Sequence, residues 1–127
     1  MSEAKTRGVR VRADPVYVPE RSQPEHSQYF FAYTITIANE GDEAVQLISR
    51  KWVITDGAGE VHEVEGMGVV GEQPQIEPGE AYQYTSHCPL RTPVGTMQGH
   101  YLMVTSGGEH FQVEIAPFAL TAPHALN

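Results

Sequence analysis

Apolar and polar residues alternate with a period of two along much of the chain. The clearest case lies in residues 28–37, where every second residue is large and apolar: Tyr29, Phe31, Tyr33, Ile35 and Ile37. Successive side chains of a strand point to opposite faces, so this segment predicts a half-buried strand. Related patterns predict further strands in residues 7–13, 16–18, 45–55, 60–65, 81–86, 97–105 and 111–115.

Turn-forming residues separate these segments. Asp14-Pro15 predicts an interruption, residues 19–27 and 66–78 predict loops, and Pro89 and Pro93 predict a break. No segment sustains a helical period. Short strands with frequent turns predict an all-β fold, an immunoglobulin-like or fibronectin type III-like sandwich of seven to eight antiparallel strands, with a barrel as the alternative. Trp52, the only tryptophan, is expected in the core.

Length and composition predict one domain over residues 1–127. We expect an ordered core over about residues 7–118 and a loose tail over 119–127. No apolar stretch approaches the roughly 18 residues of a membrane span, and the first residues lack the apolar core of a signal peptide. The single cysteine, Cys88, excludes an intrachain disulfide. These features predict a cytoplasmic protein without membrane contact.

Charge is distributed unevenly. The net charge is −8, seven of the eight Lys and Arg residues lie at or before Lys51, and none lies between Trp52 and Leu90. That interval contains seven acidic residues. An acidic chain lacks the basic face that nucleic acids require. The acidic region either attracts cations or a basic partner, or serves only as a solubilising surface.

Gly66, Gly68 and Gly71 form a GxGxxG pattern. In dinucleotide-binding folds this pattern opens a helix, but Pro74 and Pro78 follow here and no βαβ unit is predicted, so no nucleotide cofactor is expected. Two alternatives remain. The loop N–H groups bind a phosphate or pyrophosphate compound, with help from Arg50 or Arg91, or the glycines serve backbone geometry and packing.

The loop also carries a candidate interaction surface. Val69 and Val70 are apolar, and they either pack into the core or project. In the second case they form a patch whose rim is Glu65, Glu72 and Gln73.

Catalytic and metal-binding patterns are absent from the sequence. The six histidines, which form no HxxxH pair, are His26, His62, His87, His100, His110 and His124. A site assembled from several strands stays open, but we expect only weak binding of Co²⁺ or phosphate, and no resident metal. Cys88 is expected to be a partly buried free thiol, and no residue matches a nucleophile motif, so an enzyme is not predicted.

Several sequence blocks resemble the ApaG family. They occur in family order over about residues 50–103 and comprise RKWVITD at 50–56, VEGMGVVGEQP at 64–74, EPGE at 77–80, YTS at 84–86, TPVGTM at 92–97 and GHY at 99–101. The resemblance implies a fibronectin type III-like sandwich without an established enzymatic activity. In bacteria it implies a link to cobalt and magnesium tolerance, under the name CorD. Similar domains in F-box proteins and a DNA-polymerase-interacting protein imply protein recognition.

The sequence therefore favours a non-enzymatic interaction module with a protein partner. The alternative is a small-ligand binder that takes a phosphate or pyrophosphate compound on the Gly66–Gly71 loop, which is the only proposed ligand loop that the resemblance carries over. Hydrolysis of such a compound is a third class, but no metal–carboxylate pattern supports it.

Overall fold

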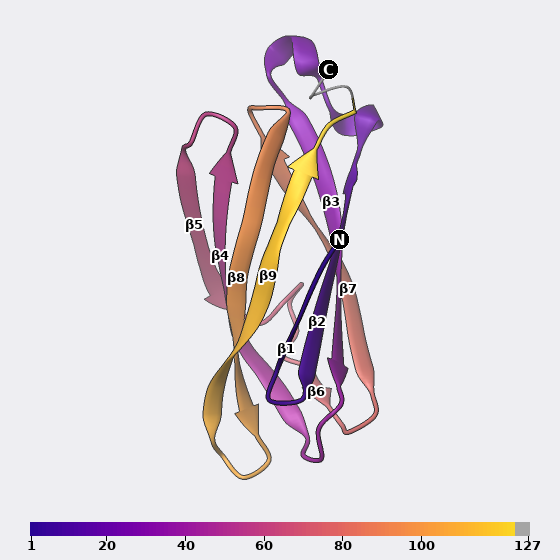
Figure 1. Cartoon of the computed structure of the whole chain (residues 1–127), viewed down its shortest axis with the longest axis vertical. Helices are drawn as coiled ribbons and strands as arrows, with labels where there is room; N and C mark the ends of the chain where they lie inside the picture. Colours follow the sequence, from indigo (N-terminus) through magenta and orange to yellow (C-terminus); the bar gives the residue numbers. More distant parts are fainter. Residues whose placement is uncertain (124–127) are drawn as a thin grey trace.

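The computed structural model describes residues 1–123 and shows two β-sheets packed face to face (Figure 1). This part of the chain contains no α-helix, and its strands are β1 (Ser2–Thr6), β2 (Val9–Tyr17), β3 (Tyr29–Asn39), β4 (Val45–Asp56), β5 (Val61–Met67), β6 (Gln75–Ile76), β7 (Ala81–Leu90), β8 (Val94–Thr105) and β9 (His110–Thr121). Two 3₁₀ turns, η1 (Pro19–Arg21) and η2 (Pro24–His26), lie between β2 and β3. The predicted all-β sandwich is confirmed.

The strand order explains the resemblance to a fibronectin type III domain. One sheet has the order β1-β2-β3-β7 and the other β5-β4-β8-β9, with the short β6 beside β4. Every pair is antiparallel. Without β1 and β6, the sheets contain three and four strands, as in that fold. β1 adds a strand to the outside of β2.

The core lies between the inner faces of the two sheets. On β3 the alternation holds as predicted, with Phe31, Ile35 and Ile37 fully buried. Trp52 is 3% exposed, and its ring packs at 5.3 Å from Tyr33 and 5.9 Å from Phe118. The core position predicted for Trp52 is therefore confirmed.

The two lateral sides of the sandwich differ. On one side β9 closes against β1, where Ser2 Oγ donates to Ala116 O at 2.8 Å and Glu114 N donates to Thr6 Oγ1 at 3.2 Å. On the other side the edge strands are β5 and β7, and each pairs with only one neighbour. The other lateral side is therefore bordered by β5 and β7, which line one groove together.

The chain ends are more ordered than the sequence predicts. The expected core of residues 7–118 is too short, because β1 begins at Ser2, β9 continues to Thr121 and Ala122 is buried. Arg7 and Gly8 belong to a turn instead of a strand, with φ of 48° and 85°. This turn returns the chain and pairs β1 with β2. The rest of the predicted loose tail, residues 124–127, lies outside the described residues.

Three prolines lie inside strands, at positions where the sequence analysis predicts either a break or no strand. β2 continues through Pro15, β7 through Pro89 and β9 through Pro117. A proline cannot donate to a neighbouring strand, but an edge strand needs only one of its two sides paired. β7 and β9 are edge strands, and β1 pairs with β2 only as far as Ala13. Edge positions therefore tolerate all three prolines.

Among the described residues, no helix has the length and apolar character needed to cross a membrane.

Candidate interaction surface

β5 is exposed along nearly its whole length. Of its seven residues only Gly66 is partly buried. Six large apolar side chains of the described residues are exposed, and four of them lie on β5 or directly after it: Val61 (56% exposed), Val64 (41%), Met67 (69%) and Val70 (57%). The other two, Met1 and Val16, lie elsewhere. We call these four side chains the β5 patch.

A tight hairpin holds β5 against β4. The Asp56 carboxylate caps the hairpin, because Oδ1 accepts hydrogen bonds at 2.9 Å from the N–H groups of Ala58 and Glu60. Residues 56–59 thus form the turn of the β4–β5 hairpin, as expected for an Asp-Gly-Ala-Gly sequence. On the outer face Lys51 Nζ lies 3.0 Å from Glu63 and 3.8 Å from Glu65. The hydrogen bond to Glu63 and the charge of both carboxylates raise the pKa of Lys51.

A groove separates the inner face of β5 from the end of β7. Its volume is about 480 Å³, and its apolar lining comes from Ile54, Val64, Cys88, Pro89 and Leu90. His62, His87 and Arg91 add polar groups to its walls. The inner side chains of β5 therefore border an open space instead of the closed core.

After β5 the loop is hydrogen-bonded to a β-bulge in β4. The register of β4 shifts between Leu47 and Ser49, and Ile48 O there accepts from Gly68 N at 2.8 Å and from Gln73 Nε2 at 2.9 Å. The chain then pairs again with β4 as β6. The loop predicted at residues 66–78 thus contains a short strand, and its first half is anchored at the bulge.

Residues 69–72 form a two-residue hairpin turn. Val69 and Glu72 exchange both main-chain hydrogen bonds, at 2.8 and 2.9 Å. The central residues have positive φ, 43° for Val70 and 83° for Gly71, as in a type I′ turn. The sequence left open whether Val69 and Val70 pack into the core or project. Val69 packs into the core, being 1% exposed, whereas Val70 projects. A β-branched residue at positive φ is strained.

The three glycines of the motif have three different surroundings. At Gly66 a Cβ would lie 2.7 Å from the Arg50 guanidinium, which donates to Met67 O at 3.2 Å and to Gly68 O at 2.8 Å. Gly68, with φ of 66°, would place a Cβ on the carbonyl oxygen of Glu72. Gly71 has positive φ, but its Cβ would meet no atom within 4 Å.

This geometry gives little support to an anion-binding loop. Arg50 does reach the loop, but its guanidinium donates to carbonyl oxygens. The N–H groups of Gly68, Val69 and Glu72 already donate to main-chain carbonyls, whereas an anion nest needs free N–H groups. Arg91 lies among the residues of the groove and not beside the loop. The contacts that explain Gly66 and Gly68 are internal to the protein.

The expected rim residues surround the loop. Glu65 lies on β5, Gln73 binds the bulge, and Glu72 Oε2 accepts a hydrogen bond at 2.9 Å from Tyr82 Oη on β7. The Glu72 contact links the loop to the opposite sheet. The sequence did not reveal this link, nor the Arg50 contact with Gly66, because each joins residues that only the fold brings together.

Metal-ligating side chains are not clustered among residues 1–123. In this range no three His, Cys, Asp or Glu side chains are grouped to hold a metal ion, and weak Co²⁺ binding stays a prediction. Cys88 is 3% exposed, so this thiol is more deeply buried than the partly buried thiol that the sequence predicts, and burial raises the pKa of the thiol to about 11. A thiol with a raised pKa is a poor nucleophile at neutral pH.

Comparisons with known proteins all point to one family. The family described as ApaG domain matches residues 19–105. A protein named ApaG from Methylorubrum extorquens (strain PA1) is 56% identical over 124 residues, which are 98% of this chain and 95% of the relative. Protein ApaG from Dechloromonas aromatica (strain RCB) is 51% identical over the full length of both chains. The crystal structure of the putative ApaA protein from Bordetella pertussis superposes with a TM-score of 0.89 at 52% identity, covering 91% of this chain and 94% of that one.

Proposed function

The chain belongs to the ApaG family, and we propose that it is a non-enzymatic interaction module whose β5 edge binds an extended, basic segment of a partner protein. One observation carries this proposal: a free strand edge concentrates four of the six large exposed apolar side chains of residues 1–123. Exposed apolar residues that gather along one strand edge among polar residues are typical of protein-binding surfaces.

Strand addition suits the geometry of β5. An edge strand presents unpaired N–H and C=O groups to which an extended peptide adds as a further strand. The side chains of that peptide alternate between two faces. One set would lie along the outer face, near Val61 and Met67, and the other would enter the groove of about 480 Å³ beside Val64.

Charge selects a basic partner. Glu60, Glu63, Glu65 and Glu72 surround the β5 patch, and Lys51, the nearest cation on the outer face, is already paired. A second copy of the chain fits poorly. If two β5 strands paired antiparallel about Val64, Glu63 of each would face Glu65 of the other, and like charges in that position are destabilising. A segment that alternates Lys or Arg with apolar residues complements this edge.

This proposed function also accounts for the link to cobalt and magnesium tolerance that the family resemblance implies. The partner protein, and not a metal bound to this chain, would depend on the cation, and the two proteins would bind each other in the cytoplasm.

Site-specific photocrosslinking tests the surface. A photoreactive amino acid at Met67 should yield a crosslinked partner in the native cell. The matched control is Val16, which is 58% exposed on β2, away from the patch. Equal crosslinking from both positions, or crosslinking from Val16 alone, would refute the proposal.

Charge reversal tests the basic partner. We expect Glu65→Lys with Glu72→Lys to keep the melting temperature within a few degrees, because exposed pairs and hydrogen bonds contribute little. The variant should lose the Met67 crosslink and fail to complement a deletion strain under cobalt stress. Glu25→Lys with Glu114→Lys changes two exposed carboxylates elsewhere by the same charge and serves as the control. Full complementation by a folded Glu65/Glu72 variant would show that the acidic rim is only a solvated surface.

A further inference from the structure

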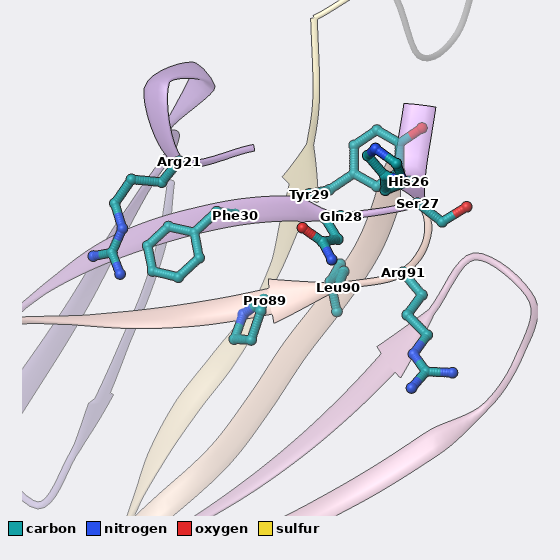
Figure 2. A pocket seen from close by; sticks show the side chains of 9 residues that line it. All are labelled: Arg21, His26, Ser27, Gln28, Tyr29, Phe30, Pro89, Leu90 and Arg91. Atoms are coloured by element: carbon teal, nitrogen blue, oxygen red, sulfur yellow. The ribbon is translucent and has the colours of Figure 1, made fainter. Parts of the chain in front are cut away.

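A second pocket lies at the end of the sandwich where β3 begins and β7 ends (Figure 2). Its volume is about 570 Å³, within the usual range for small-molecule sites. Among residues 1–123 no acidic residue lines it; the lining residues come from the η1–β3 segment (Arg21, His26, Ser27, Gln28, Tyr29, Phe30) and from the end of β7 (Pro89, Leu90, Arg91). We call it the polar-end pocket.

Apolar side chains form the floor of this pocket. β3 and β7 pair here, with Phe30 opposite Pro89 and Tyr29 opposite Leu90. The Arg21 guanidinium stacks on the Phe30 ring, 4.1 Å from its centroid. Stacking fixes the plane of the guanidinium while the N–H groups at its edge stay free to donate. The apolar floor therefore has a cation at one end, held on Phe30.

The charges of the pocket are unusual for this protein. Elsewhere basic side chains of the N-terminal strands pair with carboxylates, as in Arg7 with Glu109 and Arg12 with Asp14. Within residues 1–123, neither Arg21 nor Arg91 has a carboxylate partner. In a chain of net charge −8, two such arginines share one pocket. Figure 2 shows them on opposite sides of it, with Pro89 between them.

We propose that the polar-end pocket binds a small organic dianion, with one phosphate or carboxylate group on Arg21, the other on Arg91, and an apolar body resting on Pro89 between them. Guanidinium groups form paired hydrogen bonds with both kinds of acid. The Gln28 amide side chain, which Figure 2 places between the two arginines, adds a donor and an acceptor beside that body. None of the four side chains of the β5 patch lines this pocket, although Pro89, Leu90 and Arg91 also line the groove beside Val64.

Amide-shift titrations of the whole chain test the site. The probes are naphthalene-2,6-dicarboxylate and hydroquinone bis(methyl phosphate) as dianions, 2-naphthoate as the monoanion, and inorganic phosphate. At least one dianion should give saturable shifts at Phe30 and Arg91 and bind about tenfold more tightly than 2-naphthoate, since one charge-assisted pair has about that effect. The stronger dianion distinguishes phosphate from carboxylate recognition.

Single variants separate the pocket from general charge. Arg21→Gln and Arg91→Gln should each weaken the dianion about tenfold, to the level of the monoanion. Arg12→Gln removes the same charge from an exposed arginine on β2 and should leave the affinity unchanged. Shifts that fail to saturate at millimolar concentration, equal affinity for dianion and monoanion, or equal weakening by Arg12→Gln would each overturn the proposal. Unchanged amide shifts remote from the pocket verify that the variants are folded.

Discussion

Gly68→Ala and Gly71→Ala are the same chemical change three residues apart, and we expect them to differ about threefold in their effect on the free energy of unfolding. Both glycines have positive φ, 66° and 83°. Placing alanine there costs about 1 kcal/mol at each position. At Gly71 nothing further is lost, because the added Cβ meets no atom within 4 Å.

At Gly68 the added Cβ must displace the Glu72 carbonyl oxygen, which accepts the Val69 N–H. Losing that hydrogen bond costs about 1 kcal/mol. Moving the loop also exposes part of Val69, whose full burial contributes about 1.5–3 kcal/mol. The sum is about 3 kcal/mol for Gly68→Ala against about 1 kcal/mol for Gly71→Ala.

Urea denaturation followed by the fluorescence of Trp52, the single buried tryptophan, measures both values. In melting temperature the expected losses are about 4 °C for Gly71→Ala and about 12 °C for Gly68→Ala. Gly66→Ala should fall between them, because the Arg50 guanidinium that it meets can move. If Gly71→Ala destabilised the protein as much as Gly68→Ala, the assignment of the Gly68 effect to the Glu72 contact would be refuted.

Three further predictions follow from buried or strained groups. Val70→Asn should raise the free energy of unfolding by about 0.5–1 kcal/mol, because Asn-Gly suits a type I′ turn better than Val-Gly; a loss of stability in urea would contradict this. Tyr101→Phe should lower the free energy of unfolding by about 1–3 kcal/mol, because it removes the hydrogen-bond partner of the buried Tyr84 hydroxyl, 2.5 Å away. Changing both tyrosines to Phe should lower it by less, because no hydroxyl is then left unpaired. Additive effects in the double-mutant cycle would contradict this. Burial raises the pKa of Cys88 to about 11, so the thiol of the unfolded chain ionises first and the free energy of unfolding falls as pH rises from about 9 toward 11. In Cys88→Val this fall should be shallower. Identical pH profiles for the two proteins would disprove the contribution of Cys88 to the pH dependence.

The sequence could predict which residues form strands and which faces are apolar. The alternation in β3 and the core position of Trp52 follow directly from the chain, because successive strand residues must point to opposite faces. The glycine motif could likewise be separated from a dinucleotide site by its prolines alone. The hairpin at Asp56 follows from the turn chemistry of the residues that compose it.

Only the tertiary structure decided which strands lie at an edge. Period two reveals the faces of a strand but not its neighbours, since hydrogen bonding to a second strand depends on residues far away in the sequence. For this reason Pro89 was predicted to end a strand that in fact continues through it, and the exposure of β5 was not foreseen. Arg21 and Arg91 meet in one pocket for the same reason: the pairing of β3 with β7 brings residues 21 and 91 to the same end of the sandwich.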